Sequence, residues 1–108
     1  MTTVADIATA LSTVTGIKGV PNWPNTPTAG MAWPRIASRD LDPFPLINWE
    51  IYVALSADQK AATDKYTSVV PLIRDALRAH VFVTKDEPVV IPGPQNSMFA
   101  VLITARSE

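Results

Sequence analysis

Few residues of this chain have the types and spacing that catalysis requires. His80 is the only histidine, cysteine is absent, and the closely spaced carboxylates are Asp40 with Asp42 and Asp86 with Glu87. Each carboxylate pair could act as an acid–base couple or hold a divalent cation, but turn formation and solvation explain both pairs. At a helix end, His80 would interact favourably with the last carbonyl groups. We therefore expect no enzyme, no cofactor and no metal site. A small metal-dependent hydrolase using Asp40 or Asp42 is the enzymatic alternative.

Two tryptophans stand out as candidates for binding another protein. Trp23 and Trp33 each precede a proline, on either side of the turn-rich segment 25–30. Aromatic side chains on stiff segments offer a large contact area at a low ordering cost, although a tryptophan in a small domain also serves to close its own core. Charged residues follow Trp33 closely and could form ion pairs between subunits. The candidate interface residues are Trp23, Trp33, Arg35, Arg39, Asp40, Asp42, Lys85 and Asp86.

The composition indicates one small globular domain covering residues 1–108. Hydrophobic residues make up 47% of the chain and charged residues 18%, with a net charge of −1. A chain of this length buries enough surface for one modest core. The balanced charge provides no field that would attract nucleic acid or anionic lipid. No apolar run is long enough to span a membrane, and the first residues do not resemble a secretory signal, so we expect synthesis in the cytoplasm.

The first half of the chain predicts one helix and three strands. Apolar residues at helical spacing predict a short helix over 4–14, opened by a Thr3 and Asp6 capping pair and ended by Gly16. Segments 17–23 and 32–38 predict short strands inside a proline-rich region. Strict apolar alternation over 47–55 then predicts a half-buried strand.

The second half predicts a long helix and a closing hairpin. Ser56 and Gln59 form a capping-box pattern, and apolar spacing predicts a helix over 57–80 that bends near Pro71. Runs 81–83 and 89–91 predict strands separated by the polar segment 85–88. After a turn over 92–96, the apolar segment 98–105 predicts a central strand. The expected fold is α+β, with a mainly antiparallel sheet of four to five strands and both helices on one face.

The ordered features of nearly the whole chain resemble the small tail terminator proteins of long-tailed bacteriophages, especially phages of actinobacteria. The resemblance rests on patterns rather than on an invariant motif. It is carried by the opening helix 4–14, VPNWP (20–24), AWPR (32–35), NWEIYV (48–53), SAD (56–58) and FAVLITAR (99–106).

The resemblance implies a structural virion protein of the phage neck. Such a protein forms a ring, expected to be sixfold, that caps the tail tube, terminates its polymerisation and joins it to the head connector. DNA could then pass through the ring lumen without sequence-specific contacts. One edge strand or the 25–30 loop would contact the tube, and the 84–97 region a neighbour or the connector. Two alternatives remain: another neck protein, such as a head-closure or tail-completion adaptor, and a monomeric host adaptor that binds an extended peptide at its sheet edge.

Overall fold

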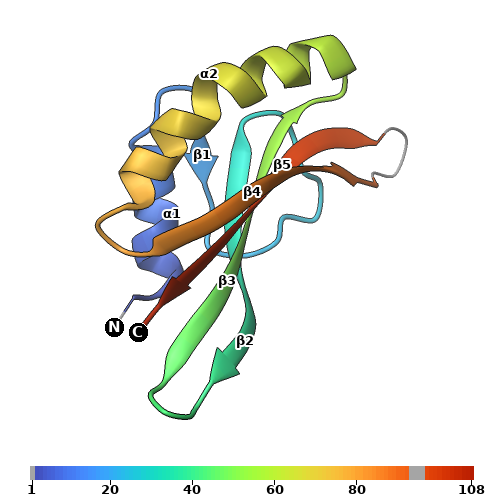
Figure 1. Cartoon of the computed structure of the whole chain (residues 1–108). Coiled ribbons are helices and arrows are strands. Elements are labelled where there is room, and N and C mark those ends of the chain that lie inside the picture. Colours follow the sequence, from blue (N-terminus) through green and yellow to red (C-terminus); the bar gives the residue numbers. More distant parts are fainter. Residues whose placement is uncertain (1, 93–96) are drawn as a thin grey trace.

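The computed structural model describes residues 2–92 and 97–108 and shows an α+β fold (Figure 1). Its sheet has the strand order β1-β2-β3-β5-β4. β1 runs parallel to β2 and the other neighbours are antiparallel, so the sheet is mixed. The elements are α1 (Val4–Ser12), β1 (Lys18–Gly19), β2 (Met31–Asp40), β3 (Leu46–Ser56), α2 (Gln59–Leu77), β4 (Phe82–Ile91) and β5 (Met98–Ser107). The α+β prediction with a helix at the start is confirmed. Neither helix in the described residues has the length and apolar content needed to cross a membrane.

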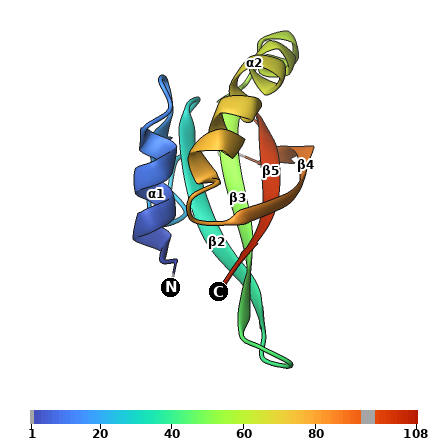
Figure 2. The ribbon, with the colours of Figure 1, turned by 60° about the vertical axis from the view of Figure 1, so that its left-hand side comes forward.

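Both helices pack on the same face of the sheet and enclose the main core with it (Figure 2). α1 begins as predicted, because Thr3 accepts a hydrogen bond from the Asp6 amide and the Asp6 carboxylate accepts one from the Thr3 amide. Its face carrying Ile7 and Leu11 is fully buried. β1 is much shorter than the expected 17–23 strand, and α1 crosses it closely at Gly19. A Cβ atom there would lie 2.1 Å from the Ala8 carbonyl oxygen.

The alternating residues of β3 form the centre of the main core, as predicted. Trp49, Ile51 and Val53 are each at most 1% exposed and face the helices. The indole nitrogen of Trp49 donates a hydrogen bond of 2.8 Å to the hydroxyl of Ser107 at the end of β5. β5 lies between β3 and β4, which confirms the prediction that the last strand is central.

The predicted capping box of the long helix is wrong. Ser56 is the last residue of β3, and its hydroxyl accepts a hydrogen bond from the Asp58 amide. Asp58 is the true N-cap, since its carboxylate accepts from the Ala61 amide. The helix also ends at Leu77 rather than at His80, and the backbone amides of His80 and Val81 donate to the Leu77 carbonyl.

Pro71 lies inside α2, as the sequence indicates. The helix axis changes direction part-way along its length (Figure 1). A proline lacks the amide hydrogen that would bond to the carbonyl four residues earlier, and its ring crowds that carbonyl, so a bend follows.

The two strands predicted at 81–83 and 89–91 are one continuous strand. β4 runs through the polar segment and is paired with β5 along its length, with a register shift between Val83 and Lys85. It is the last strand of the sheet. Proline is tolerated in an edge strand such as β4, because the backbone groups on the outer side of the strand need no hydrogen-bond partner. Pro88 can therefore lie within it. Most of the turn predicted over 92–96 falls on residues 93–96, which lie outside the described part of the chain.

The opposite face of the sheet carries a second, smaller core at one end. Trp33, Ala54, Ile91 and Ala100 are buried there. The segment between β1 and β2 places Trp23 against this core. In the described part of the chain, both helices lie on the other face, so the two faces of the sheet differ in their covering (Figure 2).

Candidate interaction surface

The two candidate tryptophans form one aromatic cluster with Tyr52. The ring centroid of Trp23 lies 5.2 Å from that of Trp33 and 4.8 Å from that of Tyr52, and the Trp33 and Tyr52 rings stack at 6.0 Å. Trp33 is fully buried, whereas Trp23 is 47% exposed. Trp33 therefore closes the second core, and Trp23 is the tryptophan that a partner could contact.

A charged pair lies beside the aromatic cluster. Arg35 and Glu50 are direct neighbours across β2 and β3, and their side chains form an ion pair. Burial, followed by the charge of Glu50, raises the pKa of the Tyr52 phenol above its ordinary value. The Arg35 side chain is 53% exposed, so this pair contributes little to stability and is available to another subunit.

The other candidates of β2 belong to a hairpin that projects from the body of the molecule. Figures 1 and 2 show the ends of β2 and β3 extending beyond both helices. Arg39 and Asp40 lie on this hairpin, and Asp42 lies in its turn. Asn48 across the hairpin donates to the Asp40 carboxylate at 3.1 Å. The charged rim expected around Trp33 is therefore divided, because Arg39, Asp40 and Asp42 lie on the projecting part.

The hairpin also exposes large apolar side chains that are not among the candidate interface residues. Leu41 is 72% exposed, Phe44 is 64% exposed, and Ile36 at the base is 45% exposed. We define the hairpin tip as Leu41 and Phe44. The signal in the sequence is the pair of large apolar residues among Asp and Pro, in a segment too polar and too proline-rich to enter a core.

The remaining candidates, Lys85 and Asp86, lie on β4, at the opposite edge of the sheet. The Lys85 ammonium group lies 3.8 Å from the Glu87 carboxylate, and both side chains are exposed. The Asp86 carboxylate accepts a hydrogen bond from the Tyr66 hydroxyl of α2. Asp86 therefore fastens the edge strand to the helix, and the eight candidates are spread over three places.

The hydrogen bond to Asp86 predicts an unusual titration of Tyr66. This bond, with burial second, raises the pKa of Tyr66 to about 12. The ordinary value is about 10, so the stabilising contribution is complete below pH ~10 and is lost as the pH rises through the raised value. In a Tyr52→Phe background, the phenolate absorbance should rise with a midpoint near 12.

Asp86→Asn in the same background is the matched control. It removes the charged acceptor, so we expect the midpoint to move toward the ordinary value, with circular dichroism recorded in parallel to confirm folding. A midpoint that is identical in the two proteins would contradict the role of Asp86.

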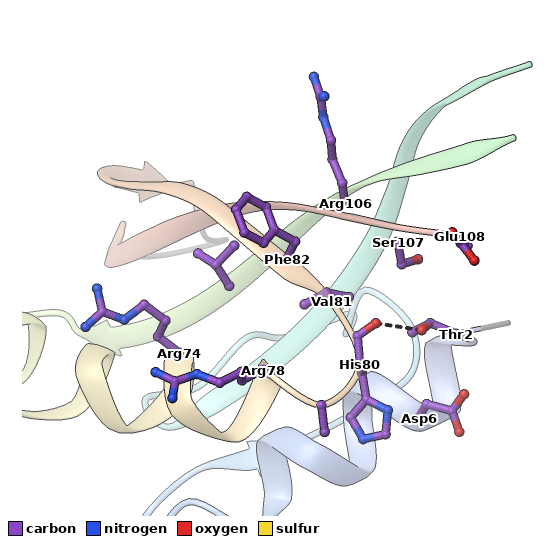
Figure 3. Close-up of a pocket in the computed structure, with 12 residues that line it drawn as sticks. Thr2, Asp6, Arg74, Arg78, His80, Val81, Phe82, Arg106, Ser107 and Glu108 are labelled. Carbon is purple, nitrogen blue, oxygen red and sulfur yellow. Dashed lines mark hydrogen bonds between the residues drawn. The ribbon is translucent and has the colours of Figure 1, made fainter. Parts of the chain in front are cut away.

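A concavity of about 860 Å³ lies between the end of α2 and the starts of α1 and β4 (Figure 3). His80 and Asp6 line it together with Arg74, Arg78 and Arg106. The Asp6 carboxylate already caps α1, and the hydrogen bonds from Thr3 lower its pKa. Figure 3 shows Arg106 extending away from His80 and Asp6. In this concavity, the Asp6 carboxylate is therefore already engaged in capping α1.

Within residues 2–92 and 97–108, no group of three or more His, Cys, Asp or Glu side chains is placed to hold a metal ion. The Asp40 carboxylate accepts a hydrogen bond from the side-chain amide of Asn48. No family model, curated protein or solved structure matches this chain. The arrangement of exposed side chains is therefore the basis for assigning a function.

Proposed function

We propose that this chain is a structural subunit of a phage neck, a tail terminator that forms a ring on the tail tube, stops its growth and joins it to the head connector. The observation that carries the proposal is the projecting hairpin with its exposed apolar tip, Leu41 and Phe44. The resemblance of the sequence patterns supplies the type of assembly, and a sixfold ring in the virion is part of the same proposal.

The hairpin supports an assembly role because the apolar residues of its tip contribute nothing to the cores of the monomer. Leu41 and Phe44 belong to neither buried cluster. Large apolar side chains gathered on a projecting element mark a contact with another protein. Strand pairing holds the hairpin in one conformation up to Asp40 and Leu46, which reduces the ordering that binding would require. The exposed Trp23 packs against the same sheet, which also carries the Arg35 ion pair, and both extend the surface available to neighbours.

The sheet edge gives less support to the alternative of an adaptor that binds an extended peptide. A peptide strand added to β4 would pair with its outer backbone groups. Pro88 lies within β4 and has no amide hydrogen to donate. An edge interrupted in this way is typical of strands protected against further pairing. Another position in the neck, such as head closure, would use the same hairpin.

Electron microscopy of the purified chain, alone and mixed with tail tube protein from the same genome, tests the proposal. We expect rings, or tubes stopped at one end by this protein. Sedimentation of the mixture should show the chain bound to tubes in a small, fixed amount. Tubes that grow to the same lengths with and without the chain would reject the terminator function.

A further inference from the structure

An apolar groove lies where α2 begins. It encloses about 380 Å³ between the first half of α2 and the neighbouring ends of β4 and β5. Most of its lining is apolar or aromatic: Leu55, Ala62, Tyr66, Val89, Phe99 and Ala100. Thr63 lies on its helical rim and is exposed. The groove is therefore open to solvent and suited to apolar side chains from another molecule.

The groove and the hairpin tip lie at opposite ends of the molecule. α2 begins at the end farthest from the turn between β2 and β3 in both views (Figures 1 and 2). The molecule is 43 Å long and only 26 and 21 Å across. The tip of one chain therefore cannot fill the groove of the same chain.

We propose that the hairpin tip of one copy inserts Leu41 and Phe44 into the groove of a second copy. This inference rests on the proposed ring, for which it names the contact between neighbours. The chain itself supplies both an apolar projection and an apolar recess of matching character, which is why a second copy is the occupant. Because the two surfaces differ and lie at opposite ends, the contact is head-to-tail, and such contacts generate closed rings or open chains.

The size of the contact indicates how the assembly behaves. An aromatic side chain buries roughly 150–250 Å², whereas a stable interface buries about 800 Å² on each partner. The tip and groove supply only part of that area. The contact is therefore weak between free copies and becomes persistent when a template holds many copies close together.

Disulfide trapping tests this contact directly, because the chain contains no cysteine. Phe44→Cys and Thr63→Cys are made as separate single variants and mixed at high concentration under a mild oxidant. We expect a disulfide-linked dimer that joins position 44 of one copy to position 63 of the other, identified by mass spectrometry. A chain that carries both substitutions should form a ladder of linked species.

Thr15→Cys is the matched control, since it places a cysteine at another exposed threonine that is outside the groove. Mixed with Phe44→Cys, it should give at least tenfold less cross-linked dimer than Thr63→Cys does. Equal yields would overturn the proposed contact. Circular dichroism of each reduced variant confirms that all of them fold.

The outcomes separate this contact from the proposed function. Tubes capped by rings that give no 44–63 disulfide would overturn the contact and leave the terminator function standing. A 44–63 ladder from a chain that leaves tube growth unchanged would establish the contact and reject the terminator function.

Discussion

Replacing Trp49 with alanine is expected to lower the free energy of unfolding by about 3–5 kcal/mol. Trp49 is 1% exposed at the centre of the main core, and truncation would leave a cavity as well as an unpaired hydroxyl on Ser107. Small domains are stable by only about 5–15 kcal/mol, so this loss removes much of the total. Urea titration followed by circular dichroism measures it.

Phe44→Ala is the control for this experiment, because its side chain lies outside both cores and should change stability by no more than about 0.5 kcal/mol. Ser107→Ala adds a finer comparison. It would leave the buried indole nitrogen of Trp49 without its acceptor, at a cost of about 1–3 kcal/mol. A Trp49→Ala variant that unfolds at the same urea concentration as the parent would contradict this description of the core.

Replacing both Leu41 and Phe44 with aspartate is expected to abolish ring formation and tube capping without unfolding the chain. Both side chains are highly exposed in the monomer, so the melting temperature should change little. In an apolar contact, each carboxylate would lose its hydration without a partner, at a cost of several kcal/mol. Since about 1.4 kcal/mol corresponds to a tenfold change in affinity, we expect association to weaken roughly a hundredfold or more.

Sedimentation and electron microscopy with tube protein measure this loss. Leu72→Asp is a suitable control, because Leu72 is a 55% exposed apolar residue on α2, away from the hairpin and the groove. It should leave assembly intact. Normal rings from the Leu41→Asp and Phe44→Asp double variant would show that the tip is not part of the assembly surface.

Some elements of this fold depend on residues close in sequence, and others depend on pairing between distant segments. The alternation of β3 and the Thr3 capping box were predictable, because side-chain period and helix capping depend on residues close in sequence. The prediction that Ser56 caps the long helix is wrong, because pairing with Phe99 on β5 keeps Ser56 in β3. The prediction that residues 85–88 separate two strands is wrong for a similar reason. β4 pairs with β5 and lies at the edge of the sheet. These two conditions outweigh the low strand propensity of Lys85, Asp86 and Pro88.

For the candidate surface too, residue types identify some of the features and only the tertiary structure decides the others. Residue types alone selected Trp23 and Trp33, but only the packing of the 20–30 segment on the sheet decides that Trp23 is exposed and Trp33 is buried. Leu41 and Phe44 stand among Asp and Pro residues in the sequence, but only the tertiary structure leaves both side chains exposed on a hairpin that extends beyond the helices.

The sequence by itself determined the α+β class, both helices, the buried strands and the lack of cysteine, since these follow from composition and local periodicity. The tertiary structure alone decided the sheet order, the projection of the β2–β3 hairpin beyond the helices and the placement of the apolar groove at the opposite end. Those features depend on which distant segments pair and pack, and the free energy of such contacts is shared among residues far apart in the chain.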